Sequence, residues 1–304
     1  MTQIPKPYPN ARAVEAAIKD AAKREHQAHP SRQVADLIRQ TYYDRFLCRV
    51  FAEGESNEWV LKGGSGMLAR LPNARRTLDA DLYRDGFQSK DQALEELRRL
   101  AHSDLGDFFR FEYRAHHTIL DDDTQPYADG YRVIFDTYLG VKELDPIKVD
   151  LSIHVGATDN IVTNDPANRL DLPKLATYPY RLYPLSSQIA DKVCATIIEY
   201  PGGRPSSREK DLVDLVIIAV TQNVRADTAS EAVQRECRKR QVTCPKRFTI
   251  PPTWGARYTR MAKGTPAGPY PVDTAKELMA RFVDPLLDGT AAGIWDPSTR
   301  QWRR

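Results

Sequence analysis

The chain of 304 residues has a net charge of only +3, and 41% of its residues are hydrophobic while 28% are charged. These proportions are typical of a globular protein with one sizeable core or two modest ones, and the small net charge does not by itself indicate nucleic-acid binding. No apolar run approaches the roughly 20 residues of a membrane span, and the N-terminal residues lack the apolar core of a secretory signal, so the composition favours a cytoplasmic protein.

The cysteines are few and scattered, at Cys48, Cys194, Cys237 and Cys244. We therefore expect no disulfide framework and a reducing compartment. Cys237 and Cys244 could help to bind zinc, but no second Cys or His pair lies at zinc-finger spacing, so a zinc site is not predicted.

Two helices are predicted in the N-terminal region, over residues 11–29 and 32–52. Ser31 is expected to cap the second helix. Its apolar residues predict one buried face, and Arg45 is expected among the side chains on the outer side. We interpret both as scaffold helices that pack on a sheet.

The most informative stretch runs over residues 59–70, where an apolar strand enters the turn Lys62-Gly63-Gly64-Ser65 and a short helix follows. Glycines at such a turn let the backbone approach a phosphate closely. The helix start that follows presents free N–H groups to an anion. This stretch therefore predicts a phosphate-binding turn.

A second strand, over residues 77–83, alternates between an apolar and a polar face. Leu78 is predicted on the apolar face, whereas Thr77, Asp79 and Asp81 share the other. Two carboxylates on one face repel each other unless a cation lies between them. Their oxygens suit Mg²⁺, which usually takes one or two carboxylates together with phosphate oxygens of a substrate.

Residues 91–154 are predicted to form an amphipathic helix and then three strands. The helix is expected over residues 91–101, and the strands over residues 109–119, 131–139 and 147–154. In the last strand Asp150 lies on the face opposite the apolar residues.

Residues 155–185 are rich in Pro, Asn, Asp and Tyr and predict a surface connector between two domains. We expect a first domain over residues 1–160 and a mainly helical second domain over residues 161–304. Its helices are predicted over residues 186–200, 208–221, 226–240 and 272–287, with a Gly- and Pro-containing tail over 289–304.

Two capping signals support the first two of these helices. Ser186 and Ser187 are expected to cap one, and Ser206 with Glu209 forms the pattern of a capping box for the other. The second helix begins with charged residues before it turns apolar, which suggests that its start faces a polar cleft.

Residues 235–260 combine basic side chains with the aromatic residues Phe248, Trp254 and Tyr258. Cations that neutralise phosphates beside aromatic rings that stack on bases are what an RNA-binding groove requires. A solvated helix end followed by a proline-containing loop explains the same pattern equally well.

A Gly-Ser turn upstream of an Asp-x-Asp strand resembles the signature of the polymerase-β-like nucleotidyltransferases. The motif Lys-Gly-Gly-Ser followed by Arg-x-Thr-x-Asp-x-Asp is similar to that of the AbiEii/AbiGii (MenT-like) toxin family. The resemblance covers roughly residues 59–83, 147–152 and 186–216. It implies an α+β fold, in which a mixed sheet flanked by helices forms a polymerase-β-like nucleotidyltransferase domain and a mainly α-helical C-terminal lobe follows.

The resemblance implies nucleotidyl transfer, in which a hydroxyl attacks the α-phosphate of an NTP and pyrophosphate leaves, with two Mg²⁺ ions. Asp79 and Asp81 would hold both ions, and Asp150 the ion that activates the hydroxyl. A salt-bridged, structural Asp150 is the alternative. The residues that would bind the nucleotide in the turn are Lys62, Gly63, Gly64 and Ser65.

In the C-terminal half the family pattern Gln-Ile-x-x-Lys matches residues 188–192, and Asp-Leu-Val-Asp matches residues 211–214. The match implies that Lys192 neutralises triphosphate charge and that Asp214 acts as an orienting base or as the partner of that lysine. Asp211 and Arg208 would be neighbours in the nucleotide site. A salt bridge between adjacent helices is the alternative reading of Lys192 and Asp214.

Thr77 suggests a switch, because its side chain shares a strand face with Asp79 and Asp81. A phosphate there would add nearly two negative charges beside the carboxylates and repel an NTP. We hypothesise that a partner antitoxin phosphorylates Thr77. A solvent-exposed threonine without such a role is the alternative.

Three functions remain open at this point. The favoured one is a monomeric toxin that, with Mg²⁺ and an NTP, adds nucleotides to the 3′ acceptor end of tRNA, blocks translation and has a cognate antitoxin. The second is a nucleotidyltransferase acting on a small molecule or a protein. The third is a non-catalytic NTP- or RNA-binding module, against which the intact set Ser65, Asp79, Asp81 and Asp150 argues.

Overall fold

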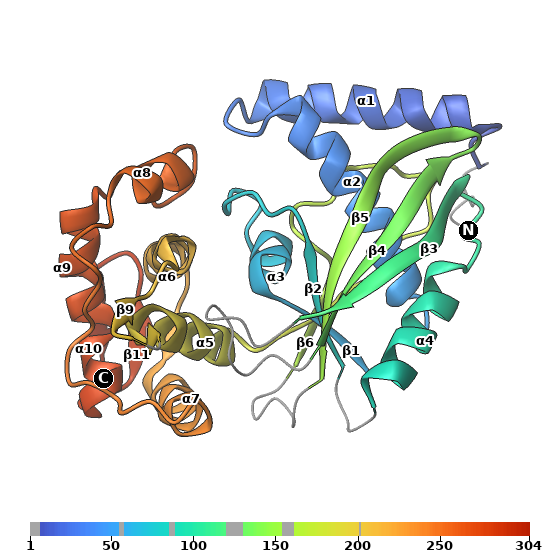
Figure 1. The fold of residues 1–304 in the computed structure, drawn as a ribbon. Helices are drawn as coiled ribbons and strands as arrows, with labels where there is room; N and C mark the ends of the chain where they lie inside the picture. Colours follow the sequence, from blue (N-terminus) through green and yellow to red (C-terminus); the bar gives the residue numbers. More distant parts are fainter. Residues whose placement is uncertain (1–6, 55–57, 85–88, 120–129, 154–160, 201) are drawn as a thin grey trace.

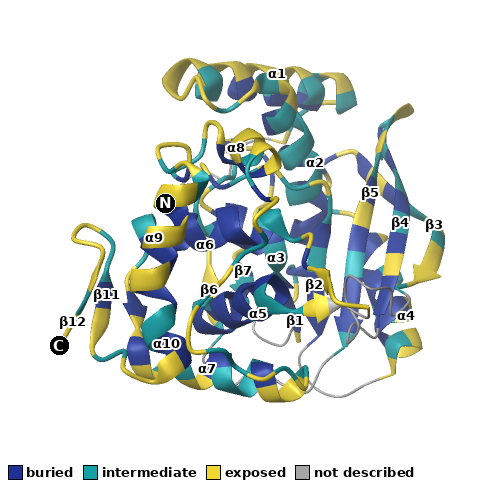
Figure 2. Ribbon diagram, turned by 60° about the vertical axis from the view of Figure 1, so that its left-hand side comes forward, coloured by how far each residue is buried: buried dark blue, intermediate teal, exposed yellow. Residues whose placement is uncertain are grey.

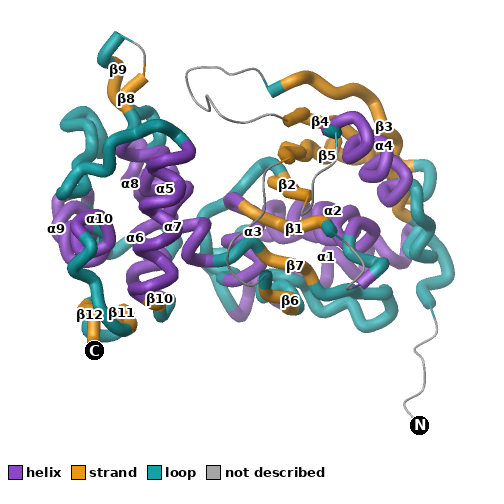
Figure 3. The backbone as a smooth tube through the Cα atoms, turned by 90° about the horizontal axis from the view of Figure 1, so that it is seen from below, coloured by secondary structure: helices purple, strands orange, loops and turns teal. Residues whose placement is uncertain are grey.

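A computed structural model describes residues 7–54, 58–84, 89–119, 130–153, 161–200 and 202–304. The first half of the chain is built on a seven-stranded mixed sheet with the strand order β3-β4-β5-β2-β1-β7-β6. The second half is mainly helical, and Figure 3 shows it beside the sheet. The predicted α+β class, with helices around a mixed sheet and a helical lobe after it, is confirmed.

The strands of the large sheet are β1 (Trp59–Lys62), β2 (Ala80–Arg84), β3 (Phe109–Thr118), β4 (Gly130–Leu139), β5 (Lys142–Ile153), β6 (Val162–Asn164) and β7 (Tyr180–Leu182). The helices of this half are α1 (Ala11–Ala28), α2 (Val34–Val50), α3 (Gly63–Arg70) and α4 (Lys90–Ala101). All four were expected close to these bounds. His154, at the predicted end of the third strand, lies outside the described residues.

The core of the first half lies between the sheet and the helices α2 and α4 (Figure 1). The ring of Phe46 on α2 packs against Phe111 on β3 and Phe135 on β4, with centroids 5.3 and 5.1 Å apart. Such aromatic contacts, together with the aliphatic side chains of β1, β2 and β5, hold the helices on one face of the sheet. The scaffold role predicted for the N-terminal helices agrees with this packing.

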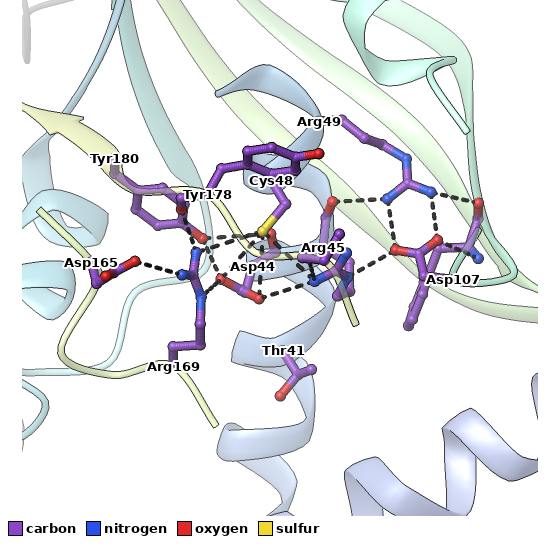
Figure 4. Close-up of polar contacts among 12 residues, drawn as sticks. Thr41, Asp44, Arg45, Cys48, Arg49, Asp107, Asp165, Arg169, Tyr178 and Tyr180 are labelled. Carbon is purple, nitrogen blue, oxygen red and sulfur yellow. Dashed lines mark hydrogen bonds and ion pairs between the residues drawn. The ribbon is translucent and has the colours of Figure 1, made fainter. Parts of the chain in front are cut away.

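The prediction that Arg45 lies on the outer side of α2 is wrong. Arg45 and Arg49 are both buried, and Figure 4 shows their guanidinium groups converging on Asp107. Arg45 Nε lies 2.8 Å from Asp107 Oδ2, and Arg49 Nη2 lies 2.7 Å from Asp107 Oδ1. A buried carboxylate supplies the counter-charge, which lets the arginines enter the core.

Two local predictions near the N-terminal elements are also wrong. Ser31 does not cap α2, because the helix begins at Val34 with Gln33 as N-cap and without a side-chain cap. Leu78 does not lie on a buried strand face; β2 begins at Ala80, and Leu78 is 52% exposed. The alternation of residues 77–83 therefore holds only from Ala80 onward.

The predicted surface connector is largely part of the first half. β7 pairs in parallel with β1, and β6 pairs with β7, so both strands extend the large sheet. Leu170, Leu172 and Leu175 are buried in the same core. The two-domain division stays a prediction, and we propose that the boundary falls near Pro184.

The C-terminal half is organised around α6 (Glu209–Thr221), whose apolar residues are almost all buried (Figure 2). Its other helices are α5 (Leu185–Ile197), α7 (Ala226–Lys239), α8 (Ala256–Ala262), α9 (Val272–Phe282) and α10 (Asp284–Asp288). Short strands complete it: β8 (Glu199–Tyr200), β9 (Arg204–Pro205), β10 (Val224–Arg225), β11 (Ile294–Asp296) and β12 (Gln301–Arg303).

The capping signals of this half are not used as predicted. α5 starts after Pro184, with Ser186 and Ser187 inside the helix. α6 starts after Arg208, and the Glu209 carboxylate accepts a hydrogen bond from the backbone N–H of Tyr258 at 2.8 Å instead of closing a capping box. Glu209, which the local pattern assigned to a capping box, therefore makes a tertiary contact with the first turn of α8 instead.

The structure of the C-terminal half differs from what the sequence suggested in three further respects. Trp254 and Tyr258 are buried in its core, so they are not a stacking surface for RNA. The tail forms the β11–β12 hairpin, which pairs with β10. Cys237 and Cys244 form a disulfide.

None of the helices in the described part of the chain is long and apolar enough to cross a membrane.

Candidate active site

The glycine turn lies where β1 ends and α3 begins. Gly63 has a φ of +60°, and a Cβ built on it would lie 1.9 Å from Asp81 Oδ2. A Cβ on Gly64 would come within 3.0 Å of the Thr77 side chain. Only glycine allows this backbone conformation together with this close approach. The turn therefore lies directly against the side chains of Asp81 and Thr77.

Ser65 fixes the turn to the neighbouring strand. Its hydroxyl donates to the carbonyl oxygen of Lys62 at 3.1 Å and accepts from the backbone N–H of Asp81 at 3.1 Å. The side chain of Ser65, a predicted nucleotide-binding residue, therefore positions Asp81.

The three predicted metal-binding aspartates come together at two adjacent inner strands of the sheet. β2 and β5 are parallel neighbours, and their register places Asp81 directly beside Asp150. Asp79 lies just before β2, where its Oδ1 accepts a hydrogen bond of 2.7 Å from the Thr77 hydroxyl. Burial, and then the negative charges of Asp79 and Asp150, raise the pKa of Asp81 to about 6.

Arg132 on β4 joins this group, and the sequence analysis missed it. Its Nε and Nη2 lie 2.7 and 2.6 Å from the two carboxylate oxygens of Asp150, and Nη2 lies 3.9 Å from Asp79 Oδ2. The β4–β5 register, which pairs Arg132 with Asp150, creates this fork. No local motif marks the residue, because the pairing of two strands decides its neighbour.

Among the described residues, no three carboxylate, imidazole or thiolate groups already stand at metal-binding spacing. The donors nevertheless fit a divalent cation, because Asp81 and Asp150 lie on adjacent strands and Asp79 lies just before one of them. Burial and the charges of the other two carboxylates raise the pKa of Asp81, as expected for carboxylates gathered without a cation. The Arg132 guanidinium supplies the positive charge among them. A metal ion would take over that charge from Arg132.

The helical half contributes a second charged cluster. Lys192 Nζ on α5 lies 2.6 Å from Asp214 Oδ2 and 3.2 Å from Asp211 Oδ1, both on α6. Arg208 Nε lies 2.6 Å from Asp211 Oδ2. Burial alone would lower the pKa of Lys192, but Asp214 and Asp211 outweigh it and raise that pKa. The lysine is therefore held as a cation at a fixed position.

Two residues that the sequence analysis missed tie the two halves together. Arg75, in the loop after α3, donates from Nη2 to Asp214 Oδ2 at 2.9 Å. Gln188 on α5 donates from Nε2 to the carbonyl oxygen of Gly63 at 2.7 Å. Gln188 is the first residue of the Gln-Ile-x-x-Lys pattern at residues 188–192, and Arg75 is the first residue of the Arg-x-Thr-x-Asp-x-Asp motif. These two motifs were the sequence signals that could have identified them.

A cleft between the halves joins both clusters. Its empty volume, with the solvent at its mouth, is about 1630 Å³, and basic side chains outnumber acidic ones in its lining. The predicted site residues in its wall are Lys62, Gly63, Thr77, Asp79, Asp81, Asp150, Lys192, Arg208 and Asp211. Gly64, Ser65 and Asp214 do not line it and instead contact residues that do. Burial lowers the pKa of Lys62 in this wall.

An α+β fold with a glycine turn beside aspartates on adjacent strands, followed by a helical lobe, is the arrangement expected of a nucleotidyltransferase. The chain belongs to the AbiEii nucleotidyltransferase toxin family: the family model described as "Nucleotidyl transferase AbiEii toxin, Type IV TA system" matches residues 45–291. The predicted family and enzyme class are confirmed. Membership in a toxin–antitoxin family implies an antitoxin partner, while the roles of individual residues stay predictions.

Three solved structures to which this chain is similar come from Helicobacter pylori and Mycobacterium tuberculosis. JHP933 from Helicobacter pylori is 15% identical, with 68% of this chain and 76% of that chain covered and a TM-score of 0.39. A putative nucleotidyltransferase from H. pylori is 14% identical, with 84% and 85% covered and a TM-score of 0.38. MenT4, a nucleotidyltransferase toxin from Mycobacterium tuberculosis, is 13% identical, with 90% and 98% covered and a TM-score of 0.45. No curated protein matches the chain.

Proposed function

We propose that this toxin transfers nucleotides from an NTP to the 3′ acceptor end of tRNA and thereby blocks translation. The main support for assigning this reaction to particular residues is that aspartates on the sheet and a buried lysine on α5 line the same cleft. Carboxylates that hold cations and a lysine that meets phosphates are the parts that phosphoryl-type transfer requires.

In this proposal Asp79, Asp81 and Asp150 hold two Mg²⁺ ions. The ions, when bound, offset the charge of the triphosphate and lower the pKa of the attacking hydroxyl. Arg132 releases Asp150 as the cations enter and remains beside the site as a donor for phosphate oxygens. Its exposed position, with 49% of the side chain accessible, leaves room for that rotation.

On the other wall Lys192 meets the negative charge of the triphosphate, and Asp211 and Asp214 fix its ammonium group. Arg208 adds a second cation at the start of α6. Because Lys192 is buried and doubly paired, it is presented in one orientation, which reduces the entropy lost when the nucleotide binds. Gln188 holds the glycine turn against the same helix.

The structure of the turn also supports the proposed switch at Thr77. The Thr77 hydroxyl donates to Asp79, so a phosphate on Thr77 would stand directly against that carboxylate. Thr77→Glu should abolish transfer, and full activity of this variant would contradict the switch.

We further propose that the enzyme acts as a monomer in the cytoplasm.

The test is to incubate the protein with total tRNA, Mg²⁺ and each labelled NTP in turn. We expect tRNA to lengthen with at least one NTP and Asp79→Ala to abolish the label. Asp273→Ala is the matched control, because Asp273 lies on α9 with 86% of its side chain exposed, far from the cleft. Label on protein or on a small molecule, with none on RNA, would favour the second function. Absence of Mg²⁺-dependent NTP binding by calorimetry would favour the non-catalytic module.

A further inference from the structure

A second groove lies between the start of α2, the loop over residues 72–76 and the turn after α8. Its empty volume, including the solvent at its mouth, is about 1210 Å³. Figure 1 shows α8 at the end of the helical half that is nearest α1 and α2. We call this space the α2–α8 groove.

The α2–α8 groove is basic. Its charged lining residues are Arg32, Asp36, Arg75, Arg76, Arg260 and Lys263. Arg260 and Lys263 are exposed, and neither has an ion pair within the part of the chain that the structure describes. Arg76 lies 2.9 Å from Asp36, the one acidic residue of the lining, and keeps 52% of its side chain accessible. Arg32 and Arg75 are paired with Glu25 and Asp214, so the positive charge that the groove offers to a ligand comes mainly from Arg260 and Lys263.

The start of α2 adds a second feature that suits an anion. The helix has 17 residues, and its N-cap Gln33 makes no side-chain hydrogen bond to the first turn. Residues 31–33 line the groove at this end of the helix, and the carboxylate of Asp36 in the first turn, which is paired with Arg76, offsets part of the positive end of the helix dipole. Backbone N–H groups at such an end, beside arginine and lysine, favour phosphate.

The groove leads to the candidate active site. Arg75 and Arg76 line both the α2–α8 groove and the cleft that contains the aspartates. Thr77 and Asp79 follow these arginines directly in the chain. An RNA strand lying along the groove would therefore reach Asp79 past Arg75 and Arg76, whereas Lys192 and Arg208 enter the cleft from α5 and the start of α6.

We infer that the α2–α8 groove binds the phosphodiester backbone of the acceptor RNA and leads its 3′-terminal hydroxyl to Asp79 and Asp81. The inference rests on the proposed transfer to RNA. No aromatic side chain is among the described residues that line the groove, so it would bind phosphates without stacking bases. The acceptor strand and the NTP would then enter the cleft from different sides.

The test compares wild type with Arg260→Ala/Lys263→Ala in binding to a short single-stranded RNA at several salt concentrations. We expect the variant to bind RNA about tenfold more weakly, with the slope of log affinity against log salt reduced by about 1.4, since two phosphate contacts are lost. Mg²⁺-dependent NTP binding, measured by calorimetry, and the melting temperature should not change.

The matched control is Lys246→Ala/Arg247→Ala, which removes two exposed cations from the loop before α8. Phe248, the next residue, donates its N–H to Asp284 at the start of α10, at the other end of the helical half from α8. An RNA affinity and salt slope that fall only in this control would overturn the inference, as would no change in the Arg260→Ala/Lys263→Ala variant. If wild type labels tRNA in either case, the proposed function stands; if wild type neither binds nor labels RNA, both fall.

Discussion

Asp81 is a buried carboxylate whose pKa is strongly shifted by its surroundings. Burial, followed by the charges of Asp79 and Asp150, raises its pKa from 3.8 to about 6. An acid whose pKa is raised by folding stabilises the fold below its unfolded pKa, and this stability is lost as the pH rises towards 6. Asp81→Asn should therefore stabilise the metal-free protein at pH 7, on the order of 2 kcal/mol.

The same substitution should give no gain below about pH 4, where Asp81 is protonated in both states. Urea unfolding at pH 4, 5 and 7 with a chelator present checks the prediction, and Asp273→Asn is the exposed control. A gain that does not depend on pH would show that the buried negative charge of Asp81 is not its cause. Transfer activity should be lost in Asp81→Asn at every pH.

Arg132 makes a different prediction for a single side chain. Its guanidinium forks onto Asp150 and lies near Asp79, so it occupies the carboxylates that a cation would use. Arg132→Gln should tighten Mg²⁺ binding several-fold in calorimetry without nucleotide, because the metal no longer displaces a cation. Arg110→Gln on β3, which removes an exposed arginine paired with Glu112, is the control. Unchanged or weaker Mg²⁺ binding in Arg132→Gln would contradict the competition.

At the scale of an element, the junction of β1 and α3 depends on Gly63. A Cβ there meets both an unfavourable φ of +60° and the Asp81 carboxylate. Gly54 has nearly the same φ, +66°, but nothing within 4 Å of its Cβ position. Gly54→Ala should thus lose only about 1–2 kcal/mol of stability from the left-handed backbone, whereas Gly63→Ala should lose more and should also abolish NTP binding.

Thermal melting and calorimetry of the two glycine variants check this comparison. Equal losses in both would mean that the close approach of the turn to Asp81 has no energetic consequence. Gln188 should share the effect in part, because its hydrogen bond to the Gly63 carbonyl joins α5 to the same junction.

At the scale of the whole molecule, the question is which half contains residues 162–182. Parallel pairing of β7 with β1 and burial of Tyr180 and Leu182 place them in the first core. In hydrogen exchange, amides of residues 180–182 should therefore be protected together with those of residues 59–62. Exchange as fast as in exposed turns would favour a boundary at residue 160 instead.

The two halves also share apolar contacts, since Met67 and Leu68 on α3 are buried with the core of the helical half. The cleft therefore lies between elements that pack on each other, rather than between domains joined only by a linker. This packing positions Lys192 opposite the aspartates, and it could not be inferred from the spacing of residues in either half.

Local patterns in the sequence were sufficient for most elements and for the candidate residues. The 3.6-residue period gave α1, α2 and α4, and the alternation of β5 placed Asp150 opposite its apolar neighbours, because these patterns depend on residues close in the chain. The glycine turn and the Asp-x-Asp pair were likewise visible in one stretch. The same local evidence assigned Arg45 to the outer side of its helix, because its buried partner Asp107 lies 62 residues away in the sequence.

The amino-acid sequence by itself indicated the family, most of the longer helices and strands, and which carboxylates and lysine are candidates for the chemistry. Only the tertiary structure decided that Arg132 faces Asp150, that Arg75 and Gln188 bridge the halves, and that a basic groove continues from the cleft. The physical reason is that side-chain period is set by neighbouring residues, whereas strand register and the packing of distant elements select which charges meet.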